Sequence, residues 1–382
     1  MTKQKKLNNY FPSSRSREEV LKDIDSNTVL KFTFASWSHE QQELFLDICT
    51  GVRGVKITYD PFFKEVFNPE YDASRLSDLL STLLGMKVNV LKILPNDTTR
   101  IASESTLLIT DIVVELADGS IANVEIQKIG YLFLGERASC YSADLLLRQY
   151  KRLRDERKKA FSYSDIKPVY TIVFFEESPM PFHIFPETFL HHVEAKSDTG
   201  IELNMLQKYL FVPLDIFQKN MQNKCISSKL EAWLTFLSSD APDVIESLVH
   251  QYPEFKPLYI DIYEMCQNTE RIMGLFSKEL EILDRNTVQL MIDQQANKIE
   301  ENEKIIAEQN AVIADKDAAI ADRDAAIADK DAAIADRDAA IADKDAAIAD
   351  KDAAIADKDA AIADMAAELA YYKKLAGVKD FE

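Results

Sequence analysis

Residues 110–127 have the sequence TDIVVELADGSIANVEIQ, in which two apolar, β-branched runs flank the segment Ala117-Asp118-Gly119. Two such runs joined by a short segment that contains Gly predict a β-hairpin. In a three-residue loop, Gly119 takes the position that requires a positive φ, and the next pair outward is Leu116 with Ser120. Continued along the strands, this register places Asp111 opposite Glu125, with Gln127 on the same face. Ile112, Val114, Val124 and Ile126 form the opposite, apolar face.

A different loop length would separate these polar side chains. A two-residue loop at Asp118-Gly119 leaves Asp111 and Glu125 on opposite faces of the hairpin. In the three-residue register, the two carboxylates repel each other unless a cation neutralises them. Oxygen ligands of this kind suit Mg²⁺ or Mn²⁺, which activate water and stabilise charge on a phosphoryl oxygen. The other interpretation is a solvent-facing strand with ordinary acidic residues, and the spacing leaves both open.

The segments around the hairpin predict an α-β-β-β-α-β order. Asp60-Pro61 predicts the start of a helix capped by Asp60, Asn68-Pro69 predicts a break, and Gly85 predicts its end. Alternating or apolar runs predict strands at 88–94, 106–116, 120–127 and 168–175, with a helix over 135–160. Residues 200–285 show helical periodicity almost throughout.

This order, with Asp111 and Glu125-x-Gln127 across a hairpin, resembles the PD-(D/E)XK nuclease superfamily. Within it, the chain is similar to the Rpn family, recombination-promoting nucleases also labelled PD-(D/E)XK family transposases. The resemblance spans roughly residues 55–176 and implies a restriction-endonuclease-like α/β core. The matching stretches are FKEVF (63–67), LLSTLLGMK (79–87), VNVLKIL (88–94), TDIV (110–113), VEIQ (124–127), RASCY (137–141) and KPV (167–169).

The resemblance implies metal-dependent cleavage of DNA phosphodiester bonds. Asp111 and Glu125 would bind Mg²⁺ or Mn²⁺, and Glu65 is a further candidate ligand on the first helix. Gln127 stands where the superfamily usually has the Lys that orients the attacking water, and Glu-x-Gln is typical of Rpn-like members. A neutral Gln can position water but supplies no positive charge. Lys128 does not replace it, because adjacent strand residues point to opposite faces.

Candidate DNA contacts follow the hairpin. Arg137 and Tyr141, four residues apart on the predicted helix, match family positions and could reach a phosphate or a metal-bound water, or they could simply pack the helix on the sheet. Residues 148–159 are net positive, which favours contact with DNA phosphates but also fits a solvated helix face. The candidates in this run are Arg148, Lys151, Arg152 and Lys158.

The C-terminal third is a repeat of the unit AAIAD(K/R)D, with Ile at every seventh position from Ile313 to Ile362. A strict seven-residue apolar repeat predicts a left-handed coiled coil. Only half of the seam is apolar. If Ile occupies heptad position a, position d is Lys or Arg, and if Ile occupies position d, position a is Asp. We expect a long helical tail that self-associates. The alternative is a frayed helix produced by repeat expansion.

Composition supplies the remaining expectations. The 382 residues carry a net charge of −19, of which residues 315–364 contribute −8, with fifteen Asp and seven Lys or Arg. Four well-separated cysteines, no long apolar run and no apolar N-terminal segment predict a cytoplasmic protein without a membrane partner. The predicted divisions are an N-terminal extension (1–54), a nuclease-like domain (55–200), a helical region (201–287) and a heptad-repeat tail (288–375).

Three functions are compatible with these features. The leading hypothesis is a metal-dependent DNA endonuclease associated with recombination or transposition. The alternative is a catalytically weak or inactive DNA-binding or assembly protein that self-associates through its coiled-coil tail. A third is an interaction scaffold without DNA chemistry. Asp111 and Glu125 favour the enzyme, whereas Gln127 keeps the second hypothesis open.

Overall fold

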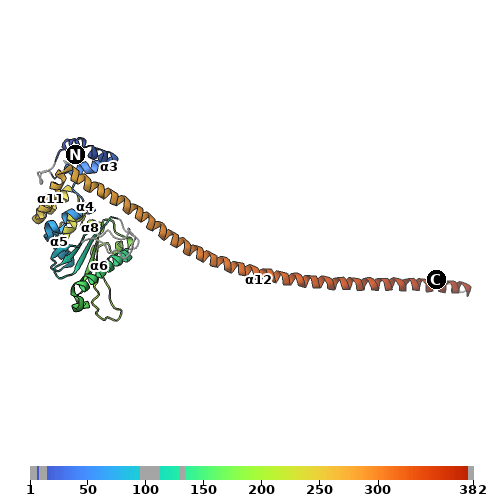
Figure 1. Ribbon diagram of the computed structural model, residues 1–382. Coiled ribbons are helices and arrows are strands. Elements are labelled where there is room, and N and C mark those ends of the chain that lie inside the picture. Colours follow the sequence, from blue (N-terminus) through green and yellow to red (C-terminus); the bar gives the residue numbers. More distant parts are fainter. Residues whose placement is uncertain (1–6, 8–14, 95–111, 129–133, 377–382) are drawn as a thin grey trace. The chain divides into compact units, whose positions relative to one another are not determined.

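The computed structural model describes residues 7, 15–94, 112–128 and 134–376 (Figure 1). The chain divides into two units, Met1–Ala296 and Asn297–Glu382, and each is treated by itself below. Asp111 lies outside the described residues, and so does the predicted strand segment 106–111. The structure therefore leaves the placement of Asp111 as a prediction.

A six-stranded mixed sheet forms the centre of the first unit. Its spatial order is β1 (Val90–Ile93), β2 (Ile112–Leu116), β3 (Ile121–Gln127), β4 (Val169–Phe175), β6 (Gln207–Pro213) and β5 (His191–Glu194). Strands β3, β4 and β6 are parallel, and the other pairings are antiparallel. The first four strands are those that the sequence predicts. Strands β5 and β6 are not predicted, and the helical interpretation is wrong for residues 207–213, because a short apolar run fits either structure.

The hairpin has the three-residue loop that the sequence favours. Ile112 pairs with Val124, and the backbone N–H of Leu116 donates to the Ser120 carbonyl at 2.8 Å. Gly119 has a φ of +87°, a conformation that costs Gly little and other residues more. This geometry confirms the predicted register from Ile112 onward.

Alternation along the strands separates two buried layers. Side chains at even positions of β2 and β3, such as Val114, Val124 and Ile126, join the main apolar core beneath α4 (Asp60–Val66) and α5 (Pro69–Leu84). Odd positions face the long helix α6 (Leu134–Arg157), where Val113 packs with Leu145. Figure 1 shows α6 on one side of the sheet and α4, α5 and α8 on the other. The sheet is therefore covered by helices on both faces.

The first two helices of the nuclease-like region break where predicted, at Asn68, and α5 ends at Gly85 with a φ of 65°. The prediction that Asp60 caps α4 is wrong, because the N-cap residue of this helix is Tyr59 and no side chain forms a capping hydrogen bond there. Instead, the Asp60 backbone N–H donates to Oε2 of Glu279 at 2.8 Å, a residue of α12 (Thr269–Leu375). The carboxylate of Asp60 is therefore not used as a cap.

The remaining helices complete the first unit. Three precede the sheet, and Trp37 and Phe45 from this segment pack on Phe276 with ring centroids 5.0 and 5.7 Å apart. One short helix lies between β4 and β5, and four lie between β6 and α12 and cover the main core. These helices are α1 (Arg17–Ser26), α2 (Thr28–Ser36), α3 (His39–Cys49), α7 (Met180–His183), α8 (Leu214–Met221), α9 (Lys229–Ser238), α10 (Pro242–Gln251) and α11 (Lys256–Gln267). Short 3₁₀ turns lie at Lys158–Ala160, Tyr163–Asp165 and Pro253–Phe255.

The second unit is helical through Leu375, as the continuation of α12. All its described residues are exposed, and the repeated isoleucines, for example Ile320 and Ile341, are 55% and 54% exposed. The long helix is as predicted, whereas its supercoiling and self-association stay predictions. Among the residues that the structure describes, no helix has the length and apolar content needed to cross a bilayer.

Candidate active site

Glu125 and Gln127 lie next to each other at the C-terminal end of β3, on the face toward α6. They are only 5% and 3% exposed, so the interpretation of a solvent-facing strand is wrong for Glu125. The Gln127 amide donates from Nε2 to Oε1 of Glu125 at 3.0 Å. The other side-chain oxygens, Oε2 of Glu125 and Oε1 of Gln127, are buried without a hydrogen-bond partner among the described residues. Such atoms are costly unless a ligand or water satisfies them.

The electrostatics of Glu125 identify its charged neighbours. Burial raises the pKa of Glu125 from its ordinary value of 4.5 to about 7, because a buried carboxylate loses its hydration. The hydrogen bond from Gln127 and the charge of Arg137 act to lower that pKa, and the charge of Asp60 acts to raise it. Arg137 from α6 and Asp60 from α4 therefore lie within electrostatic reach of the hairpin carboxylate.

Asp60 is an acidic residue that the sequence does not single out as a site candidate, and its charge acts on Glu125. It is 7% exposed at the first turn of α4, where its Oδ2 accepts a hydrogen bond from Nζ of Lys64 at 2.8 Å. Its Oδ1 is buried without a hydrogen-bond partner in the described part of the chain. A hollow of about 460 Å³ lies beside Asp60 and Lys64. The Asp-Pro pair at this position is the signal in the sequence, and by itself it indicates a helix start rather than a site residue.

Glu65, the acidic residue predicted on this helix, lines the same hollow as Asp60 but has a different partner. Its carboxylate forms an ion pair with Arg271 of α12 at 2.7 Å, and its side chain is 38% exposed. Among the two acidic residues of α4, Asp60 is the one whose charge acts on Glu125.

Arg137 and Tyr141 lie on α6, four residues apart. Tyr141 is 3% exposed and packs in the interior, while Nη2 of Arg137 donates to its hydroxyl at 3.2 Å. The Arg137 guanidinium lies 6.0 Å from the centre of the Tyr141 ring. The buried tyrosine thus contacts the arginine, which fits the packing interpretation, whereas contact of either side chain with a phosphate or a metal-bound water stays a prediction.

The predicted basic run divides into two groups. Arg148 forms an ion pair with Asp144 at 2.7 Å, and Arg152 forms one with Glu115 of β2 at 2.9 Å. Lys151 and Lys158 are exposed. The lysines present positive charge to solvent, whereas the two arginines are already paired within the chain.

Lys128, the residue after Gln127, lies on the opposite face and is 4% exposed. Its ammonium donates to the Thr58 carbonyl, forms ion pairs with Glu176 at 3.2 Å and Glu279 at 3.0 Å, and lies 4.8 Å from the centre of the Tyr59 ring. These contacts connect the end of β3 to Glu176, which directly follows β4, and to Glu279 on α12. Lys128 therefore belongs to a buried charge network on the opposite face of the sheet. It cannot take the place of the lysine that the motif usually has at the position of Gln127.

The two carboxylates of this network respond differently to their surroundings. Burial would raise the pKa of Glu176, but the charges of the two lysines that contact it outweigh burial and hold the pKa below its ordinary value. Burial raises the pKa of Glu279, and Lys128 only partly offsets that effect. The network thus depends on Lys128, which is the cation that both carboxylates share.

The donor atoms at the end of β3 suit a divalent cation. Within the described ranges, no three His, Cys, Asp or Glu side chains come together as a metal site, and the predicted ligand Asp111 lies outside those ranges. Two oxygens at the end of β3, Oε2 of Glu125 and Oε1 of Gln127, nevertheless are buried and lack hydrogen-bond partners in the described part of the chain, as does Oδ1 of Asp60 on α4. Hard oxygen donors of this kind fit Mg²⁺ or Mn²⁺.

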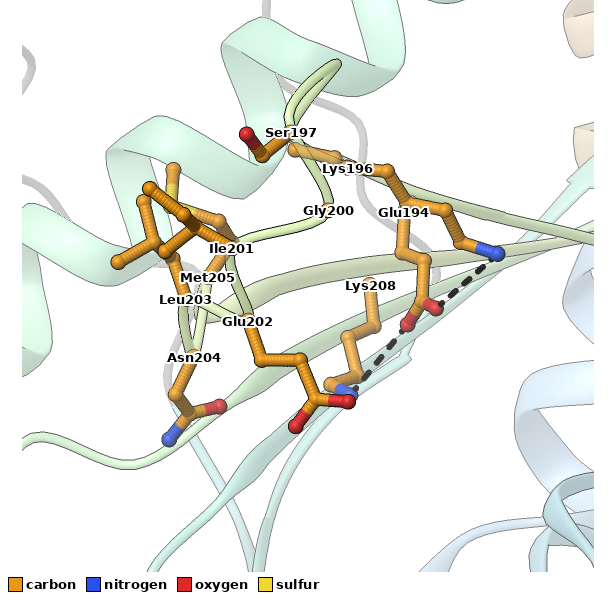
Figure 2. A pocket seen from close by; sticks show the side chains of 11 residues that line it. Glu194, Lys196, Ser197, Gly200, Ile201, Glu202, Leu203, Asn204, Met205 and Lys208 are labelled. Carbon is orange, nitrogen blue, oxygen red and sulfur yellow. Dashed lines mark ion pairs between the residues drawn. The ribbon is translucent and has the colours of Figure 1, made fainter.

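A separate hollow of about 700 Å³ lies at the connection between β5 and β6, where Glu194 forms ion pairs with Lys196 at 3.9 Å and Lys208 at 3.6 Å (Figure 2). None of the predicted site residues lines it. It is therefore not part of the candidate active site.

The raised pKa of Glu125 predicts a pH dependence of stability for the protein in EDTA. Between about pH 4.5 and pH 7, the folded state keeps a proton on Glu125 that the unfolded state has lost, so the free energy of unfolding falls as pH rises. The contribution of this group is about 3 kcal/mol across that window. Urea unfolding of wild type and Glu125→Gln at several pH values measures it, because the amide cannot titrate. A constant difference between the two proteins across the window would contradict the prediction.

Comparison with protein families gives one finding. The family model described as PD-(D/E)XK nuclease family transposase matches residues 57–290, which is more than half of the chain and includes every strand of the sheet. Searches of curated proteins and of solved structures find no match.

Proposed function

Because the chain belongs to the PD-(D/E)XK nuclease family transposases, we propose that it is a metal-dependent endonuclease that hydrolyses phosphodiester bonds in DNA. The observation that supports this most directly is the pair Glu125 and Gln127, buried side by side with two oxygens that lack a hydrogen-bond partner among the described residues. Nucleases of this superfamily generally use divalent metals. We further propose a role in recombination or transposition, as the Rpn resemblance implies.

We assign the cation to Asp111 and Glu125, with Asp60 as an additional acidic group in place of Glu65. The register pairs Ile112 with Val124, and a continuation by one further pair would place position 111 opposite Glu125, which supports this assignment. When bound, Mg²⁺ or Mn²⁺ supplies an activated water and stabilises the charge that develops on the phosphoryl oxygens. Glu125 binds as a carboxylate, which requires it to release the proton that burial favours.

Gln127 is assigned to positioning. Its Nε2–H donates a hydrogen bond to Oε1 of Glu125, and its own Oε1 remains as an acceptor that can bind one hydrogen of a water. The amide cannot remove a proton or add positive charge, so this residue orients the nucleophile rather than activating it. The charge of Arg137 acts to lower the pKa of Glu125. We assign Arg137 to a DNA phosphate, and its hydrogen bond to the Tyr141 hydroxyl orients it.

In this proposal, the DNA backbone contacts α6 and the turn that follows it, on the C-terminal side of Arg137. Lys151 and Lys158 are exposed and are assigned to phosphate contacts. Arg148 and Arg152 contribute only if DNA phosphates replace Asp144 and Glu115 as their partners. The lysines are therefore the stronger candidates for salt-dependent binding.

A plasmid assay with two matched variants tests the function and the acidic residue of α4. The full chain is expected to nick or cut supercoiled plasmid with Mg²⁺ or Mn²⁺ and not with EDTA. Asp60→Asn should reduce the rate by about 10- to 100-fold, because it removes a negative charge that acts on the proposed ligand Glu125. Glu65→Gln should leave it within about twofold, because it removes only an exposed ion pair. Equal losses in both variants would overturn the assignment of Asp60.

The neutral side chain of Gln127 supports the alternative function, a DNA-binding or assembly protein with weak or no catalysis. A protein with a neutral residue at the position of the usual lysine could bind DNA and assemble on it without efficient cleavage. DNA binding by the wild type without cleavage, across divalent metals and plasmid, linear and single-stranded substrates, would favour this alternative over the enzyme.

A further inference from the structure

The repeated segment of α12 presents an isoleucine stripe with a differently charged flank on each side. On a helix, residues i+3 and i+4 lie on either side of residue i. After each isoleucine from Ile313 to Ile355, position i+3 is Lys or Arg and position i+4 is Asp. The basic flank is Lys316, Arg323, Lys330, Arg337, Lys344, Lys351 and Lys358, and the acidic flank is Asp317, Asp324, Asp331, Asp338, Asp345, Asp352 and Asp359.

The excess negative charge lies away from the stripe. The two flanks carry seven positive and seven negative charges, so they cancel. The other eight aspartates occupy position i+2, on the far side of the helix from the isoleucines, and they account for the whole net charge of −8. They are Asp315, Asp322, Asp329, Asp336, Asp343, Asp350, Asp357 and Asp364. The seam is therefore neutral, and the far face carries the charge that opposes lateral aggregation.

The flank charges cannot neutralise each other within one helix. Opposite charges on a helix pair at spacings of three or four residues, and in this repeat those positions hold Ala or Ile. The isoleucines are exposed as well, at 54–56% from Ile313 to Ile355. The stripe thus lacks both an apolar cover and a charge partner in its own helix.

We propose that a second copy of this chain covers the stripe, in parallel orientation. In a parallel pair with a two-fold axis along the helices, the basic flank of each chain faces the acidic flank of the other on both sides of the seam. In an antiparallel pair, basic faces basic and acidic faces acidic. The charge pattern therefore selects orientation, while isoleucine contributes one apolar layer in each heptad.

Parallel pairing has a consequence for the globular units. It attaches both copies of residues 1–296 at the same end of the paired helices, because each chain enters the tail from its N-terminal side. Two nuclease sites would then act on one DNA molecule. This consequence rests on the proposed function, whereas the pairing itself does not.

Charge reversal in the full chain tests the pairing by sedimentation. Reversing all seven basic-flank residues to Glu, or all seven acidic-flank residues to Lys, places like charges across the seam and should weaken self-association by on the order of a hundredfold. An equimolar mixture of the two variants should restore a dimer. As the matched control, reversing Asp315, Asp322, Asp329, Asp336, Asp343, Asp350 and Asp357 to Lys should leave the dimer intact, since these residues lie on the far face.

Disulfide cross-linking tests the orientation. With Cys140 and Cys225 changed to Ser, Ile362→Cys on the stripe should oxidise to a covalent dimer, and Ala360→Cys on the far face should not. A parallel pair in register brings the two copies of position 362 together, and an antiparallel pair separates them. A monomeric wild type, a dimer unaffected by flank reversal, or equal cross-linking at both positions would overturn the proposal. These readouts do not depend on DNA cleavage, so a failure of the proposed function would be seen separately.

Discussion

Glu125→Gln should abolish most DNA cleavage, with a loss on the order of a thousandfold, and should leave the fold intact. The amide has the same shape and can keep its hydrogen bond with Gln127, but it cannot serve as an anionic metal ligand. Removing this charge should not destabilise the protein, because burial already disfavours the carboxylate and raises its pKa to about 7. Loss of activity without loss of stability separates a functional carboxylate from a structural one.

The measurement is the initial rate of plasmid cleavage in Mg²⁺ and in Mn²⁺, beside urea unfolding of the same preparations. Glu194→Gln is the matched control, because it neutralises a half-exposed carboxylate of β5 that the site does not use, and its rate should equal that of wild type. If Glu125→Gln cuts as fast as wild type, Glu125 is not the metal ligand and the proposed site is wrong.

Glu279→Ala should lower the free energy of unfolding by about 3–5 kcal/mol. The substitution removes one of two carboxylates that neutralise buried Lys128, and it also removes the acceptor for the Asp60 backbone N–H. Glu279→Gln should lose less, because an amide oxygen can still accept that hydrogen bond. We also expect Glu279→Ala to reduce cleavage, because Asp60 would lose the contact that holds the start of α4.

Urea unfolding of the full chain measures these changes. The neighbouring Glu281→Ala is the control, since Glu281 is exposed on the same helix and its loss should change stability by at most about 0.5 kcal/mol. Lys128→Met combined with Glu279→Leu should lower the free energy of unfolding by less than the sum of the two single changes. Each single change leaves the other charge buried without this partner. Additive losses would show that the ion pair is not the source of the stability.

The local architecture of the site could be predicted from the sequence. Side chains alternate along a strand, and loop length together with Gly119 determines which residues pair across a hairpin. These two rules place Glu125 and Gln127 on one face and Val124 and Ile126 on the other, as the structure shows. The break between α4 and α5 and the end of α5 followed equally from Pro69 and Gly85, because these signals act within a few residues.

Strand identity was less predictable toward the edge of the sheet. Residues 207–213 form β6, although their neighbourhood is dominated by helical periodicity. A seven-residue apolar run is compatible with a buried strand or a helix turn, and pairing with β4 decides between them. That pairing is a contact between distant segments, which periodicity cannot reveal.

The sequence by itself determined the hairpin register, the α-β-β-β-α-β order and the heptad spacing of the tail, because each depends on residues close together in the chain. Only the tertiary structure decided that Asp60, rather than Glu65, acts on Glu125, and that Lys128 is held by Glu279. Glu279 lies 219 residues beyond Asp60, and its side-chain carboxylate accepts from the Asp60 backbone N–H in place of the local cap that the sequence predicts. Such contacts arise when helices pack on a sheet and buried charges must find partners, and no local spacing rule specifies which distant residues will meet.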